Sequence, residues 1–180
     1  MYYYDTLFEK EWVYEHSHEN KARYILGEPG KRMLACFGIN PSTATPEQLD
    51  PTLQQVANRA KMYGYDGWVM FNVYPQRATD PNLLHEQLND EYHERNLEEI
   101  RKFFGENDCD IWAAWGTLIE KRGYLKKCLS DILLWMPATS IGRWYKIGKV
   151  SAKGHPHHPL YLSHEYSMEQ FNIKKYIEEK

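Results

Sequence analysis

The sequence predicts one three-layer α/β/α domain with a mostly parallel, four-stranded central sheet. Three observations lead to this prediction. The chain has 180 residues, of which 42% are hydrophobic and 26% charged. This length is enough for one hydrophobic core and too short for two. Short, continuously apolar runs suit strands buried on both faces. These runs alternate with segments of helical period, which favours parallel strands joined by helices. We therefore expect a single domain over 1–180, with 1–30 as an N-terminal cover and 165–180 as a C-terminal helix.

The predicted strands are four apolar runs bounded by residues that favour turns. The first run, 33–39, is followed by Asn40-Pro41, and the third, 109–115, by Gly116. The other two runs cover 68–73 and 132–135.

The most strongly marked helix begins at Pro51, with Asp50 as its N-cap. Leu53 and Val56 lie on one face, and Gly64 can end it. Further helices are predicted at Asp80-Pro81, around Tyr92 to Phe104 with a stop at Gly105, from Gly116 to Leu125, and after Ser167, which can form a capping box with Gln170.

Composition argues against several classes of protein. No apolar run approaches the roughly 18 residues that a membrane span needs. The start, Met1 to Asp5, lacks the basic and then apolar order of a signal peptide. Cys36, Cys109 and Cys128 are too widely spaced for a disulfide framework or a CxxC metal site. We expect a cytoplasmic protein without a membrane partner.

The charge is unevenly distributed. The formal net charge is -3, yet residues 132–164 hold no acidic residue and carry +4, which leaves -7 for the rest. This interval is either a solvated basic loop or a local phosphate-binding surface. Its cations are Arg143, Lys146, Lys149 and Lys153.

Polar or glycine-containing segments follow three of the predicted strands. Ligands of open parallel sheets bind beyond the carboxyl ends of the strands, where loops and helix N-termini converge. Residues 38–43 follow the first strand, Asn72 ends the second, and Gly116 follows the third. We expect these three strand ends to face one crevice.

These segments resemble motifs of the uracil-DNA glycosylase superfamily. Residues 38–41, Gly-Ile-Asn-Pro, are similar to its first active-site motif, and His-Pro-His-His-Pro-Leu at 155–160 is similar to its second, with one residue inserted. An apolar strand ending at Asn72 looks like its base-reading strand. More closely, residues 24–162 resemble an uncharacterised bacterial and phage domain of unknown function, through Gly-Ile-Asn-Pro-Ser-Thr-Ala at 38–44, Arg-Ala-Thr-Asp-Pro at 77–81 and Gly-His-Pro-x-His-Pro-Leu at 154–160.

The glycosylase resemblance implies a glycosylase-like fold and N-glycosidic hydrolysis. Asn40 would orient a water molecule, and Asn72 would read the edge of a base. Either His155 or His158 would stabilise the leaving base, since neutral imidazole can donate a hydrogen bond. The remaining candidates for base or substrate binding are Gly38, Ile39, Pro41, Ser42, Tyr74 as a stacking ring, and Arg77 as a phosphate ligand or a partner of Asp80.

Two other functions stay open. A non-catalytic module could keep the crevice and bind a nucleotide or nucleic acid. A metal-dependent hydrolase could use the nearby imidazoles, although this segment has no carboxylate before Glu165 and is stiffened by prolines. We therefore expect no metal and no cofactor, a nucleobase, nucleotide or nucleic acid as partner, and leave the oligomeric state open. The histidines of the metal alternative are His155, His157, His158 and His164.

Overall fold

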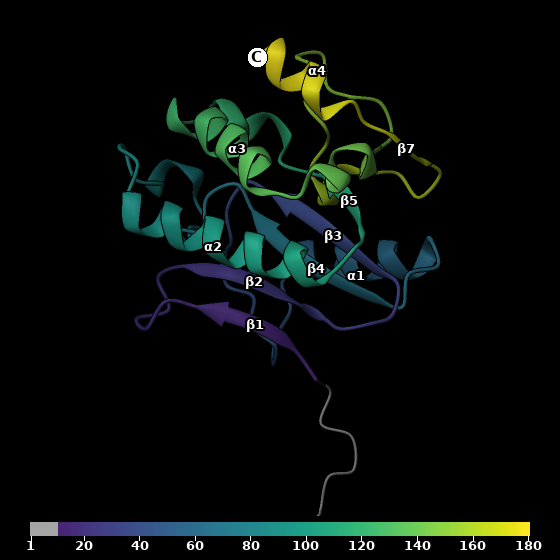
Figure 1. The fold of residues 1–180 in the computed structure, drawn as a ribbon, viewed down its shortest axis with the longest axis horizontal. Helices are drawn as coiled ribbons and strands as arrows, with labels where there is room; N and C mark the ends of the chain where they lie inside the picture. The colour runs from purple at the N-terminus through teal and green to yellow at the C-terminus, as the bar shows by residue number, and fades with distance from the viewer. Residues whose placement is uncertain (1–10) are drawn as a thin grey trace, which may run out of the picture.

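The computed structural model describes residues 11–180, which form one mixed sheet with helices on both faces (Figure 1). Met1 to Asp5, on which the expectation about a signal peptide rests, lie outside the described residues. Within the described residues, seven strands follow the order β1-β2-β4-β3-β5-β6-β7. Their bounds are β1 (Val13–His16), β2 (Arg23–Glu28), β3 (Met33–Gly38), β4 (Gly67–Asn72), β5 (Asp110–Ala113), β6 (Trp144–Ile147) and β7 (Met168–Gln170).

The helices form two layers because neighbouring residues of the central strands face opposite sides. Ala35 and Phe37 of β3 belong to one core, together with side chains of helices α2 and α3. Leu34 and Cys36 belong to the other core, which α1 covers. The α-helices are α1 (Pro51–Met62), α2 (Asp90–Glu106), α3 (Tyr124–Trp135) and α4 (Ile173–Glu178), and the short 3-10 turns are η1 (Pro81–Leu83), η2 (Gly116–Glu120), η3 (Ala138–Arg143) and η4 (Pro159–Tyr161).

The α/β class is confirmed, but the sheet is larger and more mixed than predicted. β4, β3, β5 and β6 are parallel neighbours, whereas β1, β2 and β7 pair antiparallel at the two edges. Half of the pairings are thus antiparallel. Residues 1–30, expected to be a cover, contribute β1 and β2 to the sheet itself (Figure 1).

The fourth predicted strand is wrong. Residues 132–135 form the end of α3, because Leu125, Leu129 and Ile132 continue one buried helical face. The parallel strand at this place in the sheet is β6, in which only Trp144 and Ile147 are buried. Such a short run with two half-buried residues between its apolar ends gives little periodic signal.

The helix ends are partly as predicted. Asp50 caps α1, with its Oδ1 accepting a hydrogen bond of 2.9 Å from the amide of Leu53. Gly64 follows α1 with φ of 80°, as a terminating glycine should. The predicted capping box is wrong, because Ser167 directly precedes β7 and the last helix is capped by Asn172 instead.

Several smaller features complete the fold. The predicted helix from Gly116 to Leu125 is divided into η2 and the start of α3, and Gly105 lies inside α2 rather than beyond it. All three cysteines are free thiols buried in the core. In the span from 11 to 180, no helix combines the length and apolar character that crossing a membrane requires.

Candidate functional site

The carboxyl ends of β3 and β4 open into a cavity of about 340 Å³, which we call the site cavity. The backbone ladder continues beyond the strands, because the amide of Val73 donates to the carbonyl of Gly38 and the amide of Tyr74 to that of Ile39, both at 2.9 Å. The loops that follow are thereby held side by side. Six of the predicted residues line this cavity: Gly38, Ile39, Asn40, Ser42, Asn72 and His158.

The third strand end lines an adjoining cavity of about 440 Å³. Trp115 and Gly116 contribute to its wall, and Gly116, with φ of 65°, donates from its amide to the carbonyl of Pro156 at 3.0 Å. Both cavities share His158 and Leu118. The three strand ends therefore do meet along one crevice, as expected.

Asn72 is the most unusual side chain of the site cavity. It is only 1% exposed, and both amide atoms are buried without a hydrogen-bond partner in the described chain. Its backbone carbonyl is fixed by Nδ2 of Asn96 at 2.9 Å. Gly38 leaves room for it, since a Cβ there would lie 3.0 Å from Oδ1 of Asn72 and 2.5 Å from Cε of Met70. The Asn72 amide is thus held in place with a donor and an acceptor available to a ligand.

Asn40 also lines the site cavity but is hydrogen-bonded to the loop beside it. Its Nδ2 donates to the carbonyls of Ala78 at 2.8 Å and Pro41 at 3.0 Å. Oδ1 takes no part in these bonds. The amide nitrogen therefore has a structural role, while the carbonyl oxygen is the group that can orient a water molecule.

The structure separates the two histidines that the sequence left as alternatives. His158 lines the site cavity, and its Nδ1 accepts a hydrogen bond of 3.3 Å from the amide of Leu160. Burial lowers the pKa of His158 below its ordinary value, which favours the neutral ring. A neutral ring that accepts at Nδ1 carries its proton on Nε2, so His158 can donate one hydrogen bond.

His155 lies outside the site cavity in a buried polar network. Its Nδ1 is 2.7 Å from the hydroxyl of Tyr176, and its Nε2 is 3.2 Å from Oε1 of Glu120. The Tyr176 hydroxyl also accepts from the indole N–H of Trp115 at 3.0 Å. Burial lowers the pKa of His155, whereas hydrogen bonds from Lys153 and His155 lower the pKa of Glu120 to about 2. These contacts indicate that His155 stabilises the fold and does not contact a ligand in the site cavity.

Three further predicted residues do not line the site cavity. Tyr74 is fully buried, with its hydroxyl 2.7 Å from Nδ1 of His85, so neither face of its ring is open for stacking on a base. Arg77 does not pair with Asp80: its Nη1 donates to the carbonyl of Ser42 at 2.6 Å. Pro41 is buried and supports the same loop by accepting from the amide of Ala78 at 2.9 Å.

The predicted basic surface is largely neutralised by carboxylates from other parts of the chain. Lys146 pairs with Glu169 and Lys153 with Glu120, both at 2.5 Å. Arg143 pairs with Asp108 and lies 3.2 Å from Asp110. Arg143 also precedes β6, whereas the lysines at 149 and 153 follow it, so these cations lie at opposite ends of the sheet. Of these four cations, only Lys149 is both exposed and without an ion pair in the described chain.

The histidine-rich segment does not gather into a metal centre. Within residues 11–180, no group of three or more His, Cys, Asp or Glu side chains is arranged to hold a metal ion. His157 lines only the adjoining cavity, and His155 is enclosed in its own network. The alternative of a metal-dependent hydrolase therefore has no geometric support.

Arg23 is a site residue that sequence reasoning missed. It is 1% exposed, lines the site cavity, and donates from Nη1 to the carbonyl of Ala44 at 3.2 Å, while its Nε has no partner among the described residues. Burial, assisted by the nearby Arg77, lowers the pKa of Arg23 to about 10, so it still carries its charge at neutral pH. The apolar residues Tyr24 to Leu26 that follow it are a local signal for a strand, but the charged arginine at the start of the run masks this signal.

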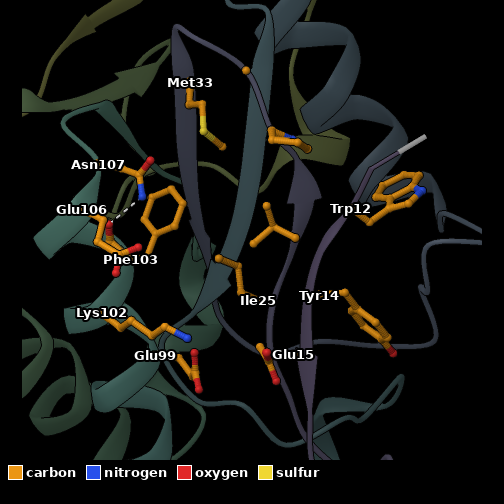
Figure 2. Close-up of a pocket in the computed structure, with 13 residues that line it drawn as sticks. Trp12, Tyr14, Glu15, Ile25, Met33, Glu99, Lys102, Phe103, Glu106 and Asn107 are labelled. Carbon is orange, nitrogen blue, oxygen red and sulfur yellow. Dashed lines mark hydrogen bonds between the residues drawn. The ribbon is translucent and has the colours of Figure 1, made fainter. Parts of the chain in front are cut away.

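A third cavity, also of about 440 Å³, lies at the opposite end of the parallel strands. Figure 2 shows Trp12 and Tyr14 on one side of it and Lys102 and Glu106 of α2 on the other. Met33, the first residue of β3, also lines it, which places it at the amino ends. None of the predicted site residues contributes to this cavity, and ligands of such sheets bind at the carboxyl ends.

Fold and site together define an α/β protein with an open mixed sheet and a crevice at the carboxyl ends of its parallel strands. Residues 23–160 match the family described as "Protein of unknown function (DUF1643)", and the chain belongs to this family. This confirms the expected membership of an uncharacterised domain family. No curated protein and no solved structure matches the chain. The comparisons thus give no support to the more distant resemblance to uracil-DNA glycosylases.

Proposed function

We propose that the site cavity binds a nucleobase, carried by a nucleoside or nucleotide. The observation that carries this proposal is the amide of Asn72 at the cavity wall, whose donor and acceptor are both buried and have no partner in the part of the chain that the structure describes. Unpaired buried polar groups are costly, and a ligand that supplies one acceptor and one donor relieves that cost. The edge of a nucleobase offers such a pair at the spacing of an amide.

The rest of the cavity suits a flat heterocycle. Its volume of about 340 Å³ is near the lower end of the range for small-molecule sites, which is roughly 300–1,000 Å³. Apolar side chains of Ile39, Leu53, Met70 and Leu118 line it and can contact the faces of a ring. A small ligand also fits the charge distribution better than a long nucleic acid, because most cations of residues 132–164 are already paired.

Hydrolysis of the N-glycosidic bond is a second candidate function, favoured by Asn40 and His158 on the same cavity. In this reaction a water molecule oriented by Oδ1 of Asn40 attacks C1′ of the sugar. The bond between C1′ and the base breaks, and its electron pair goes to the base. One proton of the water molecule is transferred to the base, and the other stays on the new hydroxyl group at C1′. Nε2–H of His158 would stabilise the developing charge on the base by a hydrogen bond.

Binding and hydrolysis can be tested separately. Isothermal titration calorimetry of the wild-type protein against the common nucleobases, nucleosides and nucleoside monophosphates should find at least one ligand, and Asn72→Ala should weaken its binding at least tenfold. Asn107→Ala, which changes an asparagine near the amino ends of the strands, is the matched control and should bind normally. If no member of the panel binds, or if both variants bind like the wild type, the proposal is wrong.

The same panel, extended with oligonucleotides that contain uracil or hypoxanthine, tests catalysis by chromatographic detection of released base. Release that is lost in Asn40→Ala and His158→Ala would support hydrolysis. Binding without release would leave the protein a binding module.

A further inference from the structure

Two guanidinium groups meet beside the site cavity, and neither forms an ion pair with a carboxylate of the described residues. Nη1 of Arg23 and Nη1 of Arg77 both donate to the carbonyl of Ala44, at 3.2 and 3.1 Å. Neither arginine forms an ion pair with any carboxylate between residues 11 and 180. Two like charges that share one oxygen, one of them almost fully buried, destabilise each other, and the carboxylate of Asp50 on the same cavity wall offsets this repulsion only in part.

Arg23 contributes to the cavity wall itself. The side chain is only 1% exposed, and its buried Nε has no hydrogen-bond partner within residues 11–180. The same wall includes the first turn of α1, a helix of 12 residues, whose N-terminus favours negative charge. The one acidic residue of the wall, Asp50, already uses Oδ1 to accept from the amide of Leu53 at 2.9 Å. This part of the cavity is therefore arranged for an anionic oxygen group.

We propose that the ligand of the site cavity carries an oxyanion that binds Arg23 while Asn72 binds its heterocycle. The inference rests on the proposed function and narrows it: the ligand carries an anionic oxygen group, such as the phosphate of a nucleoside monophosphate, and is not a neutral base or nucleoside. A carboxylate attached to the heterocycle has the same chemistry and would occupy the same place. Both sources are tested below.

The experiment is calorimetric titration of the wild-type protein with matched pairs of ligands. One pair is a nucleoside and its 5′-monophosphate, and the other is uracil and its carboxylated form, orotate. Hydrogen bonds to charged groups contribute enough that the anionic member of at least one pair should bind about tenfold to a hundredfold more tightly. The pair that shows the preference identifies the oxyanion as phosphate or carboxylate.

Variants assign the preference to Arg23. Arg23→Met should remove the preference, and Arg23→Lys should retain part of it. The matched control is Arg59→Met, because Arg59 is also buried, at 2% exposure, but donates to the carbonyls of Leu162 and Ser163 and does not line the site cavity. If Arg23→Met fails to fold, competition in the wild type replaces it: millimolar inorganic phosphate should weaken binding of the anionic ligand and leave the neutral one unaffected.

Each result decides between the two proposals. Equal affinity for both members of each pair, with binding still lost in Asn72→Ala, would overturn the oxyanion and keep the base site. A preference that survives in Arg23→Met, or competition by phosphate against neutral and anionic ligands alike, would also overturn it. Absence of binding by every ligand would overturn both proposals.

Discussion

Replacing Asn72 by leucine should make the unliganded protein more stable and abolish ligand binding. Both amide atoms of Asn72 are buried without partners among residues 11–180, and each such group costs about 1–3 kcal/mol of folding free energy. Leucine has a similar branched outline and no polar atoms. Allowing for some strain from its larger methyl groups, the free energy of unfolding should rise by about 2 kcal/mol. With a urea dependence of about 2 kcal/mol per molar, the unfolding midpoint should increase by about 1 M.

The matched control is Asn89→Leu. Asn89 caps α2, with its Oδ1 accepting from the amide of Tyr92 at 3.0 Å, so the same change should lower the free energy of unfolding by about 1 kcal/mol. Urea unfolding followed by circular dichroism gives both values, and calorimetry gives the loss of ligand binding. If Asn72→Leu destabilises the protein as much as Asn89→Leu does, the Asn72 amide supports the fold and our reasoning about the site fails.

Three further outcomes are expected, all measured by urea unfolding. Gly38→Ala should lower the free energy of unfolding by about 1–3 kcal/mol, because the new Cβ would lie 2.5 and 3.0 Å from neighbouring atoms. Gly105→Ala is the control: a Cβ there has no atom within 4 Å, so the free energy of unfolding should rise by up to about 1 kcal/mol. Equal effects of the two substitutions would contradict this prediction. Tyr176→Phe should lower the free energy of unfolding by about 2–3 kcal/mol, because the buried indole of Trp115 and imidazole of His155 lose their partner. A loss below about 0.5 kcal/mol, roughly the effect of a neutral surface substitution, would argue against the network. Because burial lowers the pKa of both His155 and His158, stability should be greatest above about pH 6.5 and should fall as the pH drops toward their lower folded-state pKa values. The decline should be shallower in His155→Gln, and an unchanged slope would speak against this assignment.

The parts of the fold that sequence reasoning predicted were those with strong local signals. β3 and β4 are unbroken apolar runs, and α1 carries both an N-cap and a terminating glycine. The failures occurred where tertiary contacts override the local pattern. Residues 132–135 are as apolar as a strand but complete a helix, and β2 contains a buried arginine that hid a strand from a search for apolar runs.

The candidate site was predictable to the extent that it depends on topology. The carboxyl ends of parallel strands meet at one edge of a sheet, so Asn40 and Asn72 were expected to converge. The choice between His155 and His158 depended on how an irregular segment folds back, which no periodicity encodes. Charge pairing was equally hidden, because the carboxylates that neutralise Lys146 and Lys153 come from distant parts of the chain.

The boundary of the family match does not coincide with the boundary of the folding unit. The match ends at residue 160, whereas Tyr176 of α4 completes the hydrogen bonds of Trp115 and His155, and β7 pairs along β6. A chain shortened to residues 23–160 would lose β1 at one sheet edge and β7 at the other, and would open a buried tryptophan to water. This protein, expressed as the matched region alone, would therefore lack the strands that border both edges of its sheet, and any aggregation would reflect the cut.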